Sequence, residues 1–299
     1  MKLWLKLSIS FALLFFIFNK IGFRDVLETV TKAKWIYLIV AILIYIAALV
    51  IDSYVFHILL KENKKVPFTQ MISLYIYSWS VGMLLPGRTG DLIIIPFLKK
   101  RGVTIGESLA AIILNRLTSV ILIIIIAFLG VYIFFRDDFL GISLTVILLV
   151  SMGLFILFHG KSRLFIEKRI LRSYAHYFTG FSKNLKSYFG PKAKLLLLNI
   201  LLTSFKILIG GFVPFLIFKS LGISIDFFIL VIIFNTVTLF SFVPFTLSGL
   251  GLRESAIWFL LVKIGIPSEI VGSAILLSIA MTYLLGFVFS IMLKVDYRV

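Results

Sequence analysis

Residues 117–135 read LTSVILIIIIAFLGVYIFF, and residues 195–218 read LLLLNILLTSFKILIGGFVPFLIF. About 20 apolar residues of α-helix span the hydrocarbon core of a bilayer, so each run is long enough to cross it. Within lipid the backbone has to satisfy its own hydrogen bonds, so a spanning segment is either a helix or a strand of a closed barrel. Barrel strands alternate apolar and polar residues over about ten positions, whereas these runs are continuously apolar. They predict an all-α integral membrane protein.

The composition of the whole chain agrees with this prediction. Of the 299 residues, 61% are hydrophobic, and the mean hydropathy is +1.13, far above that of soluble globular proteins. We therefore expect a single transmembrane domain over residues 1–299. The net charge of +17 would suggest nucleic acid as the partner of a soluble protein. In a membrane protein this charge is typical of basic cytoplasmic loops beside anionic lipid, so no nucleic-acid partner is expected.

The sequence shows none of the common enzyme signatures. Motifs such as G-x-S-x-G, H-E-x-x-H and the Walker A loop are absent. There is no cysteine, and His57, His159 and His176 lie far apart in the sequence, so a metal site is not expected. We accordingly expect no catalytic residues and no cofactor, and any transport would be gradient-driven or downhill.

Six segments are apolar enough to be full spans: about 3–18, 35–60, 106–135, 139–159, 193–219 and 269–293. The first follows Lys2 and resembles a secretory signal, but no small-residue cleavage site comes after it. We therefore expect it to be a retained helix.

Two further apolar regions, 68–98 and 225–262, are each broken near the middle by a cluster of proline, glycine and charge. The first break reads Leu85-Pro86-Gly87-Arg88-Thr89-Gly90-Asp91, and the second reads Val243-Pro244-Phe245-Thr246-Leu247-Ser248-Gly249-Leu250-Gly251-Leu252-Arg253-Glu254. Proline removes a helical donor and glycine relaxes the backbone, so each break ends one helix and begins another. The apolar arms are short for full spans, which favours two re-entrant broken-helix hairpins. Two kinked pairs of ordinary spans are the alternative.

Positive charge orients the chain in the membrane. Three loops are strongly basic and are expected in the cytoplasm: 61–66, 99–102 and 160–192. If each broken region enters and leaves by the same face, all three loops fall on one side, and both termini are cytoplasmic. Residues 137–140 and 220–225 then lie outside. We expect a multi-pass protein of the cell membrane.

The second half of the chain repeats the first. An ungapped alignment that pairs Asp91 with Glu254 also pairs Leu98 with Leu261, Gly102 with Gly265 and Val103 with Ile266. It defines a first unit over 35–136 and a second over 193–293, each with the order span, broken hairpin, span. The first unit starts outside and the second inside, so the repeat is inverted. Inverted repeats with discontinuous helices are typical of secondary transporters, whose site lies near the midplane.

Residues 160–192 between the two units are predicted to be a cytoplasmic amphipathic linker. Apolar residues recur at a spacing of three or four from Leu164 to Tyr188, with basic residues such as Lys183 between them. This periodicity favours a helix lying on the cytoplasmic leaflet. A solvated charged loop is the alternative.

Charged residues within the apolar regions are the candidate substrate-binding residues: Arg88, Asp91, Arg116, Lys206, Arg253 and Glu254. A cation at the bilayer centre costs at least about 2.5–3.5 kcal/mol, so these side chains have to face a hydrated cavity or partners. Together with Asp52, the two acids can offset three of the four cations, and the surplus positive charge favours an anionic ligand. The alternatives are a structural Arg253–Glu254 salt bridge, hydrogen bonds from Arg116 to freed carbonyls, and a snorkelling Lys206.

The two breaks also resemble the motifs of a known family. Leu84-Leu85-Pro86-Gly87-Arg88-x-Gly90-Asp91, followed by Gly102 and Asn115-Arg116, is similar to one motif of the transmembrane region of lysylphosphatidylglycerol synthases. Ser248-Gly249-x-Gly251-x-Arg253-Glu254, with Gly265 downstream, resembles that family's second motif. The resemblance covers about residues 35–293 and implies a flippase-like, lipid-handling membrane domain.

Two departures from the family pattern limit what the resemblance implies. The chain ends at Val299 without the soluble aminoacyl-transferring domain, so synthesis of lysyl-lipid is not expected. Asn115 stands where the family has an acid, which puts a proton or ion-pair role there in doubt. We therefore expect a translocase of a lipid with an anionic or phosphate-bearing headgroup. The alternatives are a non-transporting subunit that presents lipid to a separate transferase and, less favoured, an intramembrane enzyme. A second copy of the chain, in a homodimer, is a further candidate partner.

Introduced cysteines test the predicted orientation, because the chain has none of its own. A cysteine at position 183 should react with an impermeant reagent only after the cytoplasmic face is exposed. Cysteines at 64 and 100 should be labelled from the same face. Labelling of position 183 in intact cells would overturn the orientation, and labelling of 64 and 100 from opposite faces would exclude the first hairpin.

Overall fold

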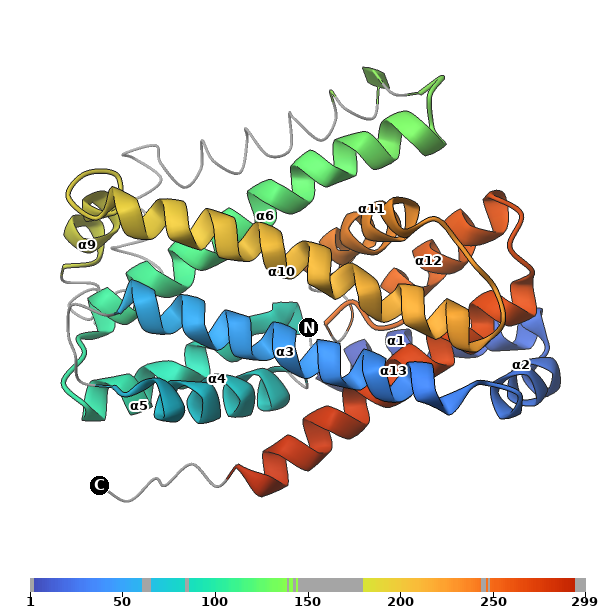
Figure 1. Ribbon diagram of the computed structural model, residues 1–299, viewed down its shortest axis with the longest axis horizontal. Helices are drawn as coiled ribbons and strands as arrows, with labels where there is room; N and C mark the ends of the chain where they lie inside the picture. The colour runs from blue at the N-terminus through green and yellow to red at the C-terminus, as the bar shows by residue number, and fades with distance from the viewer. Residues whose placement is uncertain are drawn as a thin grey trace.

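The computed structural model describes residues 3–60, 66–83, 86–138, 140–141, 144, 180–242, 246 and 248–293, with side chains except at 3–6, 86–89 and 242 (Figure 1). The described elements are helices: α1 Leu3–Ile21, α2 Phe23–Thr31, α3 Trp35–Leu59, α4 Phe68–Gly82, η2 Pro86–Ile93, α5 Ile94–Lys100, α6 Ile105–Phe134, α9 Phe181–Ser187, α10 Ala193–Ser220, α11 Phe227–Thr238, η5 Leu239–Phe242, α12 Leu252–Lys263 and α13 Ser268–Met292. Here η2 and η5 are 3-10 helices.

The predicted all-α, multi-span membrane bundle is confirmed. Among the described residues four helices are long and apolar enough to cross a membrane, namely α3, α6, α10 and α13, and there are five spans if the bent pair α1 and α2 counts as one. The bounds of these four helices agree with the predicted spans to within a few residues, whereas the bent pair α1 and α2 extends to Thr31, beyond the predicted first span of 3–18. The predicted span 139–159 lies almost wholly outside the described residues. Large apolar side chains such as Phe15, Phe205 and Phe287 remain exposed, as expected of a surface that faces lipid.

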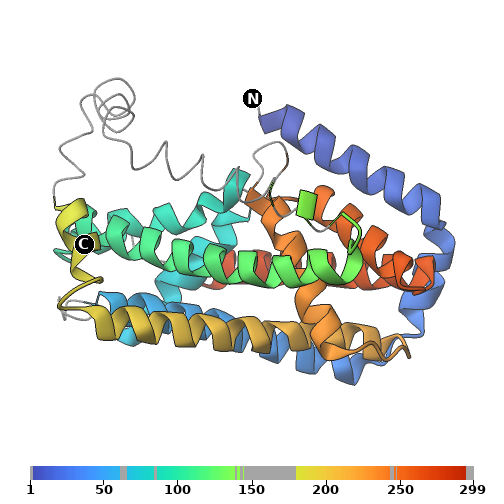
Figure 2. The same cartoon turned by 90° about the horizontal axis from the view of Figure 1, so that it is seen from above.

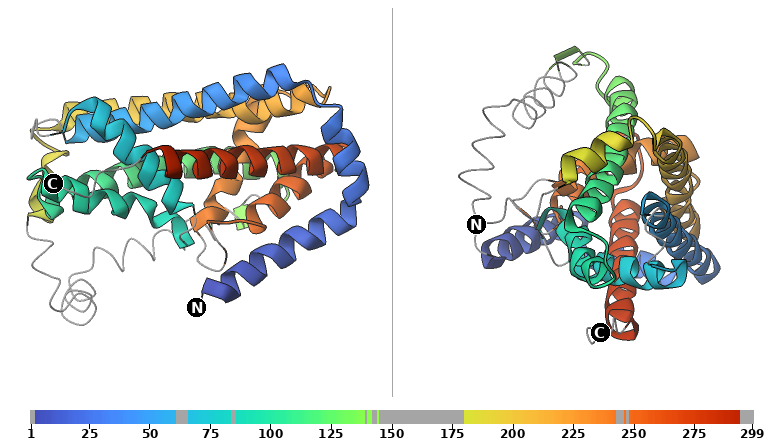
Figure 3. Two further views of the ribbon diagram at one scale, coloured as in Figure 1. Left: turned by 90° about the horizontal axis from the view of Figure 1, so that it is seen from below. Right: turned by 90° about the vertical axis from the view of Figure 1, so that its left-hand side faces the viewer.

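The N-terminal arm lies along the outside of the bundle. α1 and α2 meet at an angle of 80° at Gly22, and α1 packs against α12 and α13 (Figures 2 and 3). A Cβ atom on Gly251 would stand 2.7 Å from the Cβ of Leu13. The first helix therefore covers the start of α12, directly after the second break.

The first break turns the chain back within the bundle. α4 and α5 have their outer ends at the same end of the molecule, which is on the left in Figure 1. Helix α4 ends at Gly82, and Pro86 cannot continue a helical ladder because it has no N–H. The turn is held where the Ser78 hydroxyl donates to the Gly90 carbonyl at 2.7 Å. Gly82 and Gly90 approach so closely that a Cβ on either one would lie 2.5 Å from the Cα of the other.

The second break is built in the same way, within a hairpin whose outer ends lie at the opposite end of the molecule from those of α4 and α5. Helix α11 passes into η5, and α12 leads back toward the end from which α11 came (Figure 1). Gly249 and Gly251 have φ of +85° and +87°, a conformation in which other residues are strained. Gly249 also lies against the backbone of Ser241, as Gly90 lies against Gly82. Whether either turn is re-entrant with respect to a bilayer stays a prediction.

The helices of the two units follow the same order. α5 and α12 end in the same capping pattern, with Val103 N donating to Leu98 O and, at the aligned positions, Ile266 N donating to Leu261 O. The alignment that pairs these residues also pairs the first residues of α6 and α13. It would start α11 at Val231, whereas α11 starts earlier, at Phe227. The second break is therefore the longer of the two.

The first helices of the two units run side by side in opposite directions. Figure 1 shows α3 and α10 side by side. Lys34 N donates to Ser220 O at one end of this pair, and farther along it Asp52 meets Lys206. An inverted repeat requires this antiparallel arrangement. The two-fold relation between the whole units stays a prediction.

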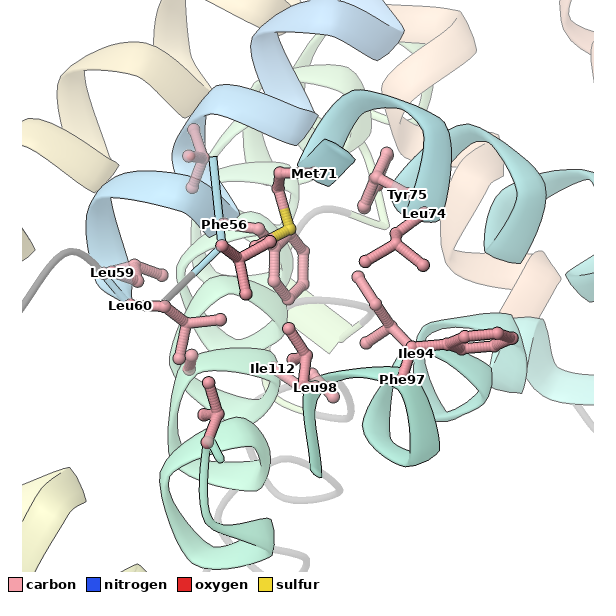
Figure 4. Packing of buried hydrophobic residues seen from close by; sticks show 14 of the residues in the cluster. Phe56, Leu59, Leu60, Met71, Leu74, Tyr75, Ile94, Phe97, Leu98 and Ile112 are labelled. Carbon is pink, nitrogen blue, oxygen red and sulfur yellow. The ribbon is translucent and has the colours of Figure 1, made fainter. Parts of the chain in front are cut away.

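Two hydrophobic clusters occupy the two ends of the bundle. The first is formed by the end of α3 with α4, α5 and the start of α6, and Figure 4 shows Phe56, Met71 and Leu98 packed within it. The second joins the start of α3 to the end of α10 and to α11, α12 and α13. Tyr45 packs against both clusters. Charged side chains such as Asp52, Asp91 and Lys206 lie between these two clusters or beside the breaks.

The predicted linker 160–192 is described only from residue 180 onward. Over 181–187 it is helical, and Phe181 and Leu185 pack against the first hydrophobic cluster. The Tyr188 hydroxyl donates to the Leu59 carbonyl at 2.7 Å. At these positions the apolar face contacts protein and not the leaflet, whereas the part of the predicted interfacial helix before residue 180 lies outside the described residues.

Basic residues gather at the end of the bundle where α5 and α9 lie (Figure 1). The described ones are Lys99, Lys100, Arg101, Lys183, Lys186, Lys192 and Lys194. At the other end basic and acidic residues occur together, as in Arg136-Asp137-Asp138. By the positive-inside rule the basic end is expected to face the cytoplasm.

The close approach at the first break predicts that Gly82→Ala destabilises the protein by about 1–3 kcal/mol, because the added methyl group would overlap the backbone of Gly90. Gly210→Ala is the matched control, since a Cβ there meets nothing within 4 Å and alanine is the better helix former. Thermal unfolding of the purified protein in detergent measures both. Equal unfolding temperatures for the two variants would contradict the close approach.

Candidate functional site

An ion pair joins the first break to the helix that follows it. Arg116 Nη2 lies 2.5 Å from Asp91 Oδ2, and both side chains are partly buried. The capping box formed by Thr104 and Glu107 sets the start of α6, and Arg116 lies eleven residues beyond it, about 17 Å along the helix axis at 1.5 Å per residue. A lone cation at this depth would be costly, and the carboxylate on the break compensates it. Arg116 therefore pairs with a carboxylate, and the alternative in which it hydrogen-bonds only to carbonyl groups freed at the break does not describe it fully.

A second ion pair joins the two units. Lys206 Nζ on α10 lies 2.7 Å from Asp52 Oδ1 on α3, with the two side chains 20% and 15% exposed. Lys206 therefore does not snorkel to a membrane surface, which was one of the alternatives. Its partner is 154 residues away in the sequence, so the contact depends on how α3 and α10 are rotated against each other.

These two pairs belong to one cluster around Tyr75 of α4. The Tyr75 side chain lies beside Asp52, and it is within the electrostatic reach of Asp91 and Arg116. Asp91 in turn interacts with Asp52 and with Lys206. We call these five residues the central cluster. It draws one polar side chain each from α3, α4, η2, α6 and α10, and its two carboxylates balance its two cations.

A third ion pair lies directly after the second break. Glu254 Oε1 accepts from Arg253 Nη2 at 2.8 Å and from Arg253 Nε at 3.0 Å, while Oε2 accepts from Gly251 N at 2.7 Å. Glu254 is only 2% exposed, so its carboxylate both caps α12 and neutralises Arg253. The salt-bridge alternative for this pair is therefore observed. Tyr45 and Tyr283 face Arg253 from α3 and α13.

The two breaks contact each other. The Ser248 hydroxyl donates to the Met83 carbonyl at 3.4 Å. Trp79, one turn before Met83, packs against Tyr45 with ring centroids 5.7 Å apart. Met83 also lies over Gly286, where any side chain would collide with its sulfur. Residues at the two breaks therefore contact each other, and the residues around Met83 also contact α3 and α13.

The six candidates from the sequence divide into three groups. Asp91, Arg116 and Lys206 come together in the central cluster, whereas Arg253 and Glu254 form a separate pair. The backbone of Arg88 lies in η2, and its side chain is outside the described residues. Sequence reasoning used Asp52 only to balance charge and overlooked Tyr75. An acidic residue inside an apolar helix is unusual, so the sequence could have marked Asp52 as a functional residue. A tyrosine in such a helix is common, so the sequence contains no signal for Tyr75.

The arrangement is suited to binding an anion by exchange of partners. Each described cation of the site is held by a carboxylate, and an incoming phosphate offers the same charge and the same acceptor oxygens. Within the described residues no group of three or more His, Cys, Asp or Glu could hold a metal ion. This geometry would allow a cation inside the apolar bundle to exchange its carboxylate partner for another anion and back again.

The family described as "Lysylphosphatidylglycerol synthase TM region" matches residues 3–290, which is nearly the whole chain. No curated protein matches the chain.

The Asp52–Lys206 pair makes a prediction about stability. Asp52→Asn or Lys206→Met alone should destabilise the protein by about 3–5 kcal/mol, because each leaves one buried charge without its partner. The double variant should lose less than the sum of the two. Lys32→Ala is the control, because its pair with Glu28 is 73% and 63% exposed and contributes at most about 0.5 kcal/mol. Thermal unfolding in detergent measures all four. Strictly additive losses would show that the two side chains do not depend on each other.

Proposed function

Since the chain belongs to the family of lysylphosphatidylglycerol synthase transmembrane regions, we propose that it is a membrane lipid translocase that moves an anionic or phosphate-bearing lipid between leaflets. Family membership supports a lipid-related role in the membrane, and the translocase function goes beyond it. The proposal contains no catalytic step and treats the chain as a carrier and not as an enzyme. Its partners would be lipids with anionic headgroups.

The observation that carries the proposal is the central cluster of paired charges inside an apolar bundle. A bundle that only had to be stable would gain from apolar side chains at these positions, since buried ion pairs often contribute less than well-packed hydrophobic residues. Arg116 and Lys206 place two cations near the first break, where the helix is interrupted. Intramembrane charges facing the interior of a bundle are typical of substrate pathways.

The pairs also suggest how binding is coupled to movement. Lys206 holds the second unit to the first through Asp52, and Arg116 holds α6 to the first break through Asp91. A phosphate that takes Lys206 and Arg116 as its own partners releases both carboxylates and weakens these two ties. A ligand shifts a conformational equilibrium only by binding one state better than the other. Breaking the ties on binding supplies this difference and favours exposure of the site to the opposite leaflet.

One observation favours the alternative of a non-transporting subunit that presents lipid to a separate transferase. Glu254 is fully engaged by Arg253 and by the backbone N–H of Gly251. This charge therefore stabilises the start of α12 whether or not lipid binds. If all three pairs were structural in this way, the protein would bind lipid without moving it.

Transport in liposomes of purified protein tests the proposal. Arg116→Ala and Arg253→Ala should slow the movement of a fluorescent anionic phospholipid by about tenfold or more, because each removes a charge-assisted contact of about 1.5–3 kcal/mol. Arg253→Lys should restore little, since an ammonium cannot reproduce a bidentate guanidinium. Lys32→Ala should leave the rate unchanged.

Three other outcomes would count against this proposal. Lipid that co-purifies with the protein but does not move would favour the presenting subunit. Unchanged rates in the Arg116→Ala variant would exclude the central cluster from the pathway. If Arg253→Ala unfolds the protein and the added change Glu254→Ala restores it, the third pair is structural only.

A further inference from the structure

The two carboxylates of the central cluster do not depend equally on their cations. Asp91 accepts a hydrogen bond from Arg116, which is its hydrogen-bond partner among the described residues. Asp52 is paired with Lys206, and Tyr75 lies beside it as well. A tyrosine hydroxyl is a neutral donor that favours the ionised form of a carboxylate next to it. If both cations turned to another anion, Asp52 would keep a donor and Asp91 would keep none.

The charges around Asp91 decide what a change of its partner costs. The charged and titratable side chains within its electrostatic reach come from four helices and are Asp52 of α3, Tyr75 of α4, Arg116 of α6 and Lys206 of α10. The contacting helix η5 has no titratable residue, and the cations of α5, Lys99 and Lys100, lie in its last turn. On η2 itself Arg88 precedes Asp91 by one turn, and its side chain is outside the described residues. The five residues of the central cluster together carry no net charge.

The helices that carry the two cations are fastened to each other. Asn199 Nδ2 on α10 donates to Thr118 Oγ1 on α6 at 2.9 Å, and both side chains are buried. This bond involves neither ion pair, so it persists when the carboxylates are displaced. Arg116 and Lys206 both lie within the electrostatic reach of Asp91, so an anion that displaces its carboxylate meets both cations.

A phosphodiester brings one negative charge into this neutral cluster. Without Arg116, an ionised Asp91 would be an unpaired carboxylate, 21% exposed, inside an apolar bundle and within reach of a second carboxylate, Asp52. An uncompensated charge in such surroundings is strongly unfavourable, and of two neighbouring carboxylates one takes a proton readily. A single proton on Asp91 restores neutrality.

The aligned acid of the second unit does not share this dependence. Glu254 Oε2 accepts from the backbone N–H of Gly251 at 2.7 Å, in addition to the bonds from Arg253 to Oε1. If a ligand took Arg253, Glu254 would keep a backbone donor that favours its ionised form. The geometry therefore distinguishes the first break from the second as a place for a proton.

We propose that Asp91 is a proton-binding site that couples lipid movement to a proton gradient. Asp91 takes up one proton from water at the face where the lipid enters, when the phosphate takes Arg116 from it. When the phosphate leaves at the other face, Arg116 pairs with Asp91 again and the proton returns to water there. One negative and one positive charge cross together, so the step is electroneutral and runs from the acidic to the alkaline side. This inference rests on the proposed function and adds the ion that drives it.

The pH dependence of binding tests the proton site. Phosphatidylmethanol is the probe, because its headgroup has no group that titrates near neutral pH. The full-length protein in nanodiscs of zwitterionic lipid should bind it about tenfold more weakly for each unit by which the pH rises, over the range in which Asp91 is ionised in the free protein and protonated in the loaded one. Asp91→Asn is neutral in both states and should bind it equally at every pH. Glu28→Gln, which changes an exposed carboxylate of α2, should keep the full dependence.

Transport of fluorescent phosphatidylmethanol in liposomes tests the coupling. In the wild type an imposed pH gradient should accumulate the probe in the leaflet on the alkaline side, and a potassium diffusion potential of either sign should have no effect. In Asp91→Asn the lipid crosses without a proton and carries its charge alone. The potential should then drive the movement, and the pH gradient should not.

Infrared difference spectroscopy of the wild type decides the question if Asp91→Asn fails to fold after Arg116 loses its partner. Binding of phosphatidylmethanol should produce the carbonyl band of a protonated carboxylic acid, and isotope-labelled aspartate should shift this band. Absence of the band would overturn the inference.

The other outcomes separate the inference from the function on which it rests. A probe that binds and moves equally at every pH would overturn the proton site and leave the translocase in place. A pH dependence that persists in Asp91→Asn would show that another group takes the proton, and would also overturn the assignment to Asp91. If the probe neither binds nor moves at any pH, the proposed function fails and the inference fails with it.

Discussion

Lys206 and Asp52 place opposite charges 2.7 Å apart in the interior of an apolar bundle, and the remaining arrangement depends on this pair. A charge in the hydrocarbon region has to meet a partner, so α3 and α10 have to lie side by side and in one rotational setting. This setting brings α6 against α10 through the Thr118–Asn199 hydrogen bond. It also brings Tyr75 of α4 to Asp52. One electrostatic constraint thus orients four helices toward a common interior.

The two breaks supply what continuous helices cannot. A regular helix uses its backbone polar groups internally, whereas an interrupted one has N–H and C=O groups at the interruption that need other partners, as where Gly90 O accepts from Ser78. Glycine allows the two sides of the first break to approach closely, because neither Gly82 nor Gly90 has a side chain between the two backbones. At the second break, Glu254 caps α12 with one carboxylate oxygen and holds Arg253 with the other. In the proposed translocase the carboxylate at the first break would release its cation to a ligand, whereas the carboxylate at the second break also holds the start of α12.

The two units share their order of helices but not their lining. α5 and α12 end in the same capping pattern, which follows from a glycine with positive φ at the same place in each, Gly102 and Gly265. The polar side chains that would contact a headgroup come mainly from α6, η2 and α10. The positions of α13 that align with Asn115 and Thr118 of α6 carry Ser278 and Met281. The two predicted units thus share an order of helices and a capping pattern, while the side chains at matching positions of α6 and α13 differ.

The sequence by itself determined the class of protein, the spans and the positions of the breaks. Continuous apolar runs and Pro/Gly clusters are local properties, and lipid excludes the other backbone structures that might compete with a helix. Sequence reasoning also identified Asp91, Arg116 and Lys206 as charges that need partners. Only the tertiary structure decided which partners they have. Asp52 meets Lys206 across 154 residues, and this contact depends on the rotation of two helices about their own axes, which packing of the whole bundle decides.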